Sequence, residues 1–144
     1  MTVQHVTDRL DEYSPYGYPV LRLGLGGMIL LAGLHKLVRP TVWSAYMAPW
    51  AAGVVHAVGV PVNLFMQGNG VLEAVLGLAI AADRYTAIAA GLVSLSLLAI
   101  SINMATLGTA FLDVLIRDLG LLALAVGVTL LAAGRQGEAT AAER

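Results

Sequence analysis

Glu73 is a carboxylic acid within an apolar stretch, residues 61–82, that carries no other charge. If this stretch crosses a membrane, the acid lies in the hydrocarbon, where a charged side chain costs about 2.5–3.5 kcal/mol on insertion scales. Residues that bear such a cost are candidates for function, and a carboxyl group in this setting can carry a proton. Asn69 lies four residues before Glu73 and therefore shares its helix face. The sequence thus makes Glu73 the candidate catalytic residue.

Other polar side chains lie near the ends of apolar stretches. Arg22 opens the first stretch, and His35 and Lys36 close it, whereas Arg117 and Asp118 open the last one. If successive stretches alternate in direction, Lys36 and Arg117 approach from one side of the membrane and Arg22 from the other. Two alternatives stay open: the cations can mark the interface by extending to water, and an acid in a first helical turn suits the helix dipole.

The composition places these residues in a membrane protein. Of the 144 residues, 58% are hydrophobic and only 12% are charged, against about 25% charged in a typical soluble domain. So few charges cannot cover the surface that a soluble chain of this length exposes. The net charge of −1 disfavours nucleic-acid binding. The absence of cysteine excludes disulfides, thiolate chemistry and cysteine-bound metals.

The apolar stretches are long enough for transmembrane helices, which need about 20 residues each. They cover residues 20–38, 61–82, 85–104 and 114–133. Continuous rather than alternating hydrophobicity favours helices over barrel strands. We therefore predict an all-α integral membrane four-helix bundle over residues 20–133. A polar N-terminal segment, residues 1–19, precedes it, and a polar tail that we expect to be frayed, residues 134–144, follows it.

The segment between the first two spans, residues 40–52, is predicted to form a short interfacial helix. Pro40 is well placed to start it, and Trp43, Tyr46 and Trp50 then follow on one helical face. Tryptophan and tyrosine favour the headgroup region of a membrane. The segment is either a plain aromatic anchor or a lid over a lipid-soluble ligand. We also expect Pro61 to begin or precede the second span.

The distribution of basic residues indicates how the bundle is oriented. Four spans place both termini on one side of the membrane, and cytoplasmic segments carry an excess of lysine and arginine. The side of the termini holds Arg9, Arg22, Arg84, Arg135 and Arg144, and the other side holds Lys36, Arg39 and Arg117. We therefore predict a multi-pass protein of the cell membrane with both termini in the cytoplasm.

Glu73 is expected to point into the bundle, because on the lipid face it has no partner. Gly70 and Gly77 share its face, whereas Val71 and Val75 lie on the opposite one. The two glycines leave room beside the carboxyl group for a neighbouring helix or a ligand.

A cavity is therefore predicted next to Glu73. We expect the first span to bound it near Gly33 and Lys36, and the fourth span to bound it near Arg117 and Asp118. Whether the Lys36 side chain reaches Glu73 is left open by the sequence.

Several short motifs together resemble the DoxX family. They are Leu21–Gly24, Gly33–Leu37, Gly59–Pro61, the glycine–glutamate–glycine segment Gly70–Gly77 and Ile116–Leu122. The resemblance implies a four-helix membrane protein of bacteria or archaea. It also implies that the chain is related to a broader group, which includes the quinone-reducing subunit of thiosulfate:quinone oxidoreductase and partners of membrane redox complexes. Membership of a family does not by itself establish an enzyme.

Two hypotheses follow from the residues and the resemblance. In the first, the chain is a subunit of a respiratory or redox complex that binds a quinone or another lipid-soluble ligand near Glu73. It then holds no tightly bound cofactor and no metal, and a partner subunit supplies the electrons. The predicted ligand-binding residues are Arg22, His35, Lys36, Trp43, Tyr46, Trp50, Asn69, Arg117 and Asp118.

In the second hypothesis, the chain is a non-catalytic scaffold or small transporter subunit, in which Glu73 only links helices. Either form can be a homo-oligomer.

Overall fold

The computed structural model of the protein describes residues 10–142, and within this range every regular element is a helix. Four of these helices are long and apolar enough to cross a membrane. They are α2 (Gly17–Val38), α5 (Val62–Ala81), α6 (Thr86–Ala105) and α7 (Leu112–Ala142). The predicted all-α membrane bundle is therefore confirmed.

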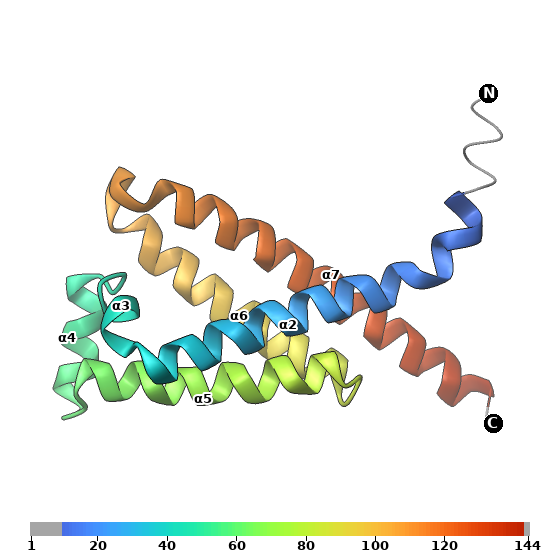
Figure 1. Ribbon diagram of the computed structural model, residues 1–144, viewed down its shortest axis with the longest axis horizontal. Helices are drawn as coiled ribbons and strands as arrows, with labels where there is room; N and C mark the ends of the chain where they lie inside the picture. The colour runs from blue at the N-terminus through green and yellow to red at the C-terminus, as the bar shows by residue number, and fades with distance from the viewer. Residues whose placement is uncertain (1–9, 143–144) are drawn as a thin grey trace.

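The four long helices form two pairs, in which α2 packs along α5 and α6 packs along α7 (Figure 1). Glycines bring the backbones of α2 and α5 together. A Cβ atom added to Gly33 would lie 2.5 Å from the backbone nitrogen of Ala74, and one added to Gly77 would collide with the backbone of Leu30. Only glycine fits such a contact, and close backbone approach is how small residues stabilise membrane helix pairs.

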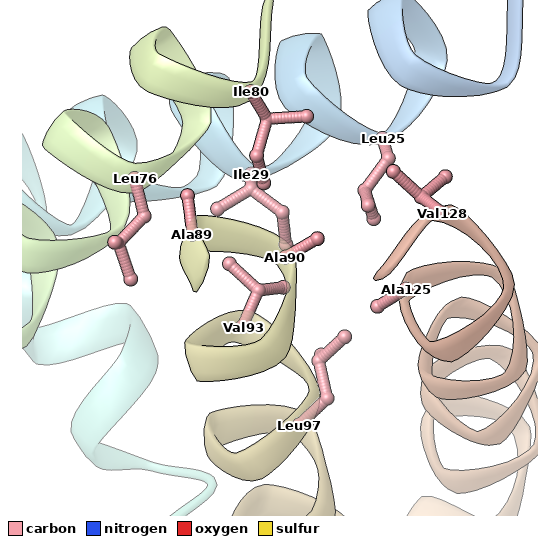
Figure 2. Packing of buried hydrophobic residues seen from close by; sticks show 10 residues of the cluster. All are labelled: Leu25, Ile29, Leu76, Ile80, Ala89, Ala90, Val93, Leu97, Ala125 and Val128. Carbon is pink, nitrogen blue, oxygen red and sulfur yellow. The ribbon is translucent and has the colours of Figure 1, made fainter. Parts of the chain in front are cut away.

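The two pairs meet at a hydrophobic core near the end of the bundle where α2 begins and α5 ends. All four long helices contribute buried side chains to it (Figure 2). The cluster consists of Leu25, Ile29, Leu76, Ile80, Ala89, Ala90, Val93, Leu97, Ala125 and Val128. Toward the other end of the bundle, at α3 and α4, the pairs diverge (Figure 1).

The connections between helices follow local backbone preferences. Pro61 has an extended backbone with ψ of 136° and directly precedes α5, so its predicted position is confirmed. Between α5 and α6 the chain reverses through Asp83 and Tyr85, which both have left-handed φ values of 56° and 54°. Such values are uncommon for residues other than glycine, although aspartate tolerates them better than most.

The segment between α2 and α5 forms two short helices, α3 (Pro40–Ser44) and α4 (Pro49–Ala57). The prediction of one helix over residues 40–52 is therefore wrong. Pro49 explains the break, because a residue before proline is pushed out of the helical conformation. Ala48 accordingly has an extended backbone with ψ of 149°, and α4 restarts at Pro49.

The polar segments at the two ends are more helical than the sequence suggests. Residues 10–13 are helical, and the 3₁₀ turn η1 (Ser14–Tyr16) carries the chain into α2. At the other end α7 continues to Ala142, so the tail expected to be frayed is helical as far as the structure describes it. Alanine, glutamate, glutamine and arginine are strong helix formers and account for this extension. Residues 1–9 and 143–144 lie outside the described range.

Candidate functional site

A pocket of about 550 Å³ lies between the two helix pairs, where α2 and α6 end and α5 and α7 begin. Its volume is typical of sites that hold small ligands. Ile29 and Leu97 belong both to the core and to the lining, so the core closes one end of the pocket. Trp50, which lines the pocket, is 53% exposed. The pocket therefore reaches the outside of the bundle near α4.

A buried ion pair forms part of the pocket wall. The Nζ of Lys36 lies 2.5 Å from the Oε1 of Glu73 and 2.8 Å from the Oδ1 of Asn69. Lys36 is only 4% exposed and Glu73 only 6%. The ring of Trp43 lies on another side of the ammonium group, with its centroid 4.6 Å from Nζ. The structure thus shows that Lys36 reaches Glu73, which the sequence left open.

The orientation of Glu73 agrees with the face predicted for it. Gly70, Glu73 and Gly77 are buried, whereas Val71 and Val75 are exposed on the opposite face. The predicted cavity beside Glu73 is also present.

Glycine contacts set the register that makes the ion pair possible. A Cβ atom on Gly70 would lie 2.9 Å from the Cβ of Lys36. The lysine stem therefore starts one helical turn from Glu73 and extends along α5 to reach it. Gly33 faces the backbone of α5 and does not line the pocket, contrary to expectation.

A second pair of charged residues lines the pocket from α7. The Nε of Arg117 lies 3.2 Å from the Oδ1 of its neighbour Asp118. Asp118 is buried, but the Arg117 side chain is 55% exposed. The pocket therefore has a carboxylate on its α5 wall and another on its α7 wall.

Aromatic side chains form a continuous row from the end of α2 to the start of α7. Trp43 donates its Nε1–H to the Nδ1 of His35 at 3.0 Å. Trp43 also packs edge-on against Tyr46, with ring centroids 6.3 Å apart, and Tyr46 packs edge-on against Phe111 at 5.3 Å. His35, Trp43 and Tyr46 all line the pocket, and ligand binding by them stays a prediction, whereas Phe111 was not singled out.

The DoxX family model matches residues 17–106, which is more than half of the chain. The chain belongs to the DoxX family. No curated protein and no solved structure matches it. The matched DoxX region runs from α2 to the start of the α6–α7 connection, so it contains Lys36, Asn69 and Glu73. Arg117 and Asp118, on α7, lie beyond it.

Asn103 holds the α3–α4 connection of the DoxX bundle against α6. Its amide donates to the carbonyl oxygen of Tyr46 at 2.7 Å and accepts from the backbone N–H of Ala48 at 2.9 Å. Nearby, the Nε1–H of Trp50 donates to the hydroxyl of Thr106 at 2.9 Å. Asn103 was not among the residues predicted from the sequence. A polar amide near the end of an apolar span was the available signal, because polar groups inside membranes tend to be functional or structural.

Arg22, predicted to bind a ligand, does not line the pocket. It lies fourteen residues before Lys36, which places it about 21 Å away along α2. Its guanidinium donates to the carbonyl oxygens of Ile80 and Ala81, and its Nε lies 3.8 Å from the Oδ1 of Asp83. A cation suits the last carbonyl groups of a helix. Arg22 therefore caps α5 at the closed end of the bundle.

The pocket combines apolar walls with a few polar groups. Among residues 10–142, no three histidine, aspartate or glutamate side chains converge to hold a metal. The Oε2 of Glu73 is buried and has no hydrogen-bond partner within this part of the chain. A buried acceptor without a partner is costly. A ligand that donates a hydrogen bond to Glu73 would remove this cost.

Proposed function

We propose that this DoxX protein binds a quinone, or a similar lipid-soluble aromatic ligand, beside Glu73 as a membrane subunit of a redox complex. The observation that carries the proposal is the buried Lys36–Glu73 pair in the wall of a largely apolar pocket. An apolar ring fits such walls, while a few polar groups fix its orientation. The exposed side of the pocket near Trp50 gives a ligand dissolved in the membrane a way in.

A bound quinone supplies two-electron chemistry that is coupled to two protons. Glu73 is placed to exchange a proton with a ring oxygen, because a carboxyl group within hydrogen-bond reach can act as a general acid or base. The positive charge of Lys36, 2.5 Å from Oε1, keeps this carboxyl group in position and offsets negative charge nearby. We propose that a partner subunit supplies or accepts the electrons. We also propose the cell membrane as its location, with both termini in the cytoplasm.

The proposal is tested by blocking the pocket. Ala32 lines the pocket, so Ala32→Phe fills part of it, whereas Ala123→Phe makes the same change at an exposed position of α7 outside it. The full chain is purified in mild detergent from a host that contains quinone, and extracted lipids are analysed by liquid chromatography. We expect quinone to copurify with the wild type and with Ala123→Phe, and to be lost in Ala32→Phe. Wild-type protein without quinone above the lipid background would contradict the proposal.

A non-catalytic scaffold or small transporter subunit is the second candidate. It is favoured by the fact that the Lys36–Glu73 pair joins α2 to α5, which explains Glu73 without any ligand. Glu73→Gln separates the two candidates, because glutamine keeps an acceptor for Lys36 and removes the titratable proton. The redox role predicts that quinone-dependent activity of the assembled complex is lost while the protein stays folded. The scaffold role predicts that the variant protein that folds and assembles keeps its activity.

A further inference from the structure

We infer that the pocket prefers a quinol, with its two phenolic hydroxyl groups, over the corresponding quinone. This inference rests on the proposed function and names the redox form that the site holds. It follows from the hydrogen-bonding groups that remain available once the protein's own contacts are made.

The buried cation has at most one donor to spare. An ammonium group has three N–H bonds. Lys36 donates one N–H to the Oδ1 of Asn69 at 2.8 Å and a second to the Oε1 of Glu73 at 2.5 Å. The ring of Trp43 covers another side of the ammonium group. Trp43 in turn gives its own N–H to His35. Lys36 therefore neutralises charge and has at most one N–H left for a ligand carbonyl.

The carboxylates, in contrast, keep acceptor capacity. Each carboxylate has about four lone-pair sites. Glu73 uses its Oε1 for Lys36, and its buried Oε2 has no partner within residues 10–142. Asp118 accepts one hydrogen bond at Oδ1, from the partly exposed Arg117. Two walls of the pocket, on α5 and α7, thus present acceptors to whatever lies between them.

A quinol and a quinone differ in what they offer to these acceptors. A para-quinol carries a hydroxyl donor at each end of its ring, so it can donate toward Glu73 on one wall and Asp118 on the other. A hydroxyl bonded to a carboxylate is among the stronger hydrogen bonds in proteins. A quinone presents only carbonyl oxygens, which a carboxylate oxygen repels. The amide of Asn69 and the exposed guanidinium of Arg117 still have N–H groups, so a quinone binds too, but less tightly.

The tryptophans give a direct measurement of binding. The protein has two, Trp43 and Trp50, and both line the pocket. The purified full chain in lipid nanodiscs is titrated without oxygen with decylubiquinone, with its quinol, and with the dimethyl ether of that quinol. The ether keeps the ring and lacks both hydroxyl donors. Dissociation constants are taken from the midpoints of fluorescence quenching. We expect the quinol to bind at least tenfold more tightly than either other ligand, which is the effect of one charge-assisted hydrogen bond.

Three variants locate the origin of the preference. Glu73→Gln and Asp118→Asn should each reduce the preference for the quinol several-fold. Asp113→Asn makes the same kind of change at an exposed acid of α7 outside the pocket, and should leave the preference unchanged. If a pocket variant fails to fold, as judged by circular dichroism, the comparison of quinol with ether on the wild type decides the question.

The outcomes separate this inference from the proposed function. Equal affinities for the three ligands, or tighter binding of the quinone, would overturn the preference and leave quinone binding intact. A failure of all three ligands to bind would overturn both.

Discussion

The side-chain amide of Asn103 donates a hydrogen bond to the carbonyl oxygen of Tyr46 at 2.7 Å, joining α6 to the connection between α3 and α4. The same amide accepts from the N–H of Ala48 at 2.9 Å. The break between α3 and α4 therefore depends on a side chain from a distant helix. Backbone groups that leave helical structure away from water need such partners.

Replacing Asn103 should loosen the α3–α4 connection. Asn103→Leu removes both hydrogen bonds and should cost about 1–3 kcal/mol of stability. We expect a lower thermal unfolding temperature in detergent and faster cleavage by protease near residues 45–48. Asn63→Leu, at an exposed position of α5, is the matched control and should change neither. Equal behaviour of the two variants would show that Asn103 does not hold the connection.

Removing the partner of Glu73 should be strongly destabilising. Lys36→Met leaves a buried carboxylate without its cation, and breaking a buried pair in this way costs about 3–5 kcal/mol. The double variant Lys36→Met with Glu73→Leu removes both charges. Its loss of stability should be smaller than the sum of the two single losses. Arg39→Met, at an exposed position, provides the control. Additive losses in the double variant would contradict direct coupling of the two side chains.

The glycine contact between α2 and α5 predicts opposite effects at two positions of one helix. Gly33→Ala places a Cβ atom 2.5 Å from the backbone nitrogen of Ala74, and overpacking of this kind costs about 1–3 kcal/mol. Gly27→Ala places a Cβ atom where nothing lies within 4 Å. It should leave stability unchanged or raise it by up to about 1 kcal/mol, because alanine favours helices over glycine. Thermal unfolding of both variants checks this, and a stable Gly33→Ala would count against the contact.

The α5–α6 turn should make stability depend on pH at the acidic end. The hydroxyl of Thr86 donates to Asp83 and, together with the hydroxyl of Tyr18 and the charge of Arg22, holds the pKa of Asp83 below its usual value. A lowered folded-state pKa means that the stabilisation is complete above about pH 3.9, the unfolded value. It is lost as the pH falls through the lower folded value.

The size of this effect is small, because the Asp83 side chain is 48% exposed. We expect less than about 1 kcal/mol at pH 7. Asp83→Asn retains tolerance of the left-handed backbone and removes the charge. The difference in unfolding temperature between wild type and variant should be present at pH 7 and shrink toward pH 3. A difference that stays constant over this range would rule out a role for the charge.

Much of the fold is encoded locally and was predictable from the sequence. The spans follow from length and hydropathy, and the inward orientation of Glu73 follows from the cost of a charge facing lipid. Pro49 also carried a readable signal for the break between α3 and α4. The helical spacing of Trp43, Tyr46 and Trp50 suggested one continuous helix instead.

The pairing of side chains between helices was less predictable. Whether Lys36 reaches Glu73 depends on how closely α2 approaches α5, and on the register in which Gly33 and Gly70 meet the opposite backbone. Neither quantity is visible in the periodicity of one helix. The contacts of Arg22 were also unpredictable from the sequence. Its partners are backbone carbonyl oxygens at the end of α5, and no pattern of side chains identifies them.

The divergence of the two helix pairs toward one end makes access to the pocket asymmetric with respect to the bilayer. The core fills the space between the pairs at the other end, where Arg22 also fastens α2 to α5. Under the proposed function, the arrangement of residues 10–142 brings a lipid-soluble ligand to Glu73 from the leaflet beside α3 and α4. A long-tailed ligand in the opposite leaflet would first have to cross the bilayer, so its exchange with the pocket should follow its rate of transverse movement in the surrounding lipid.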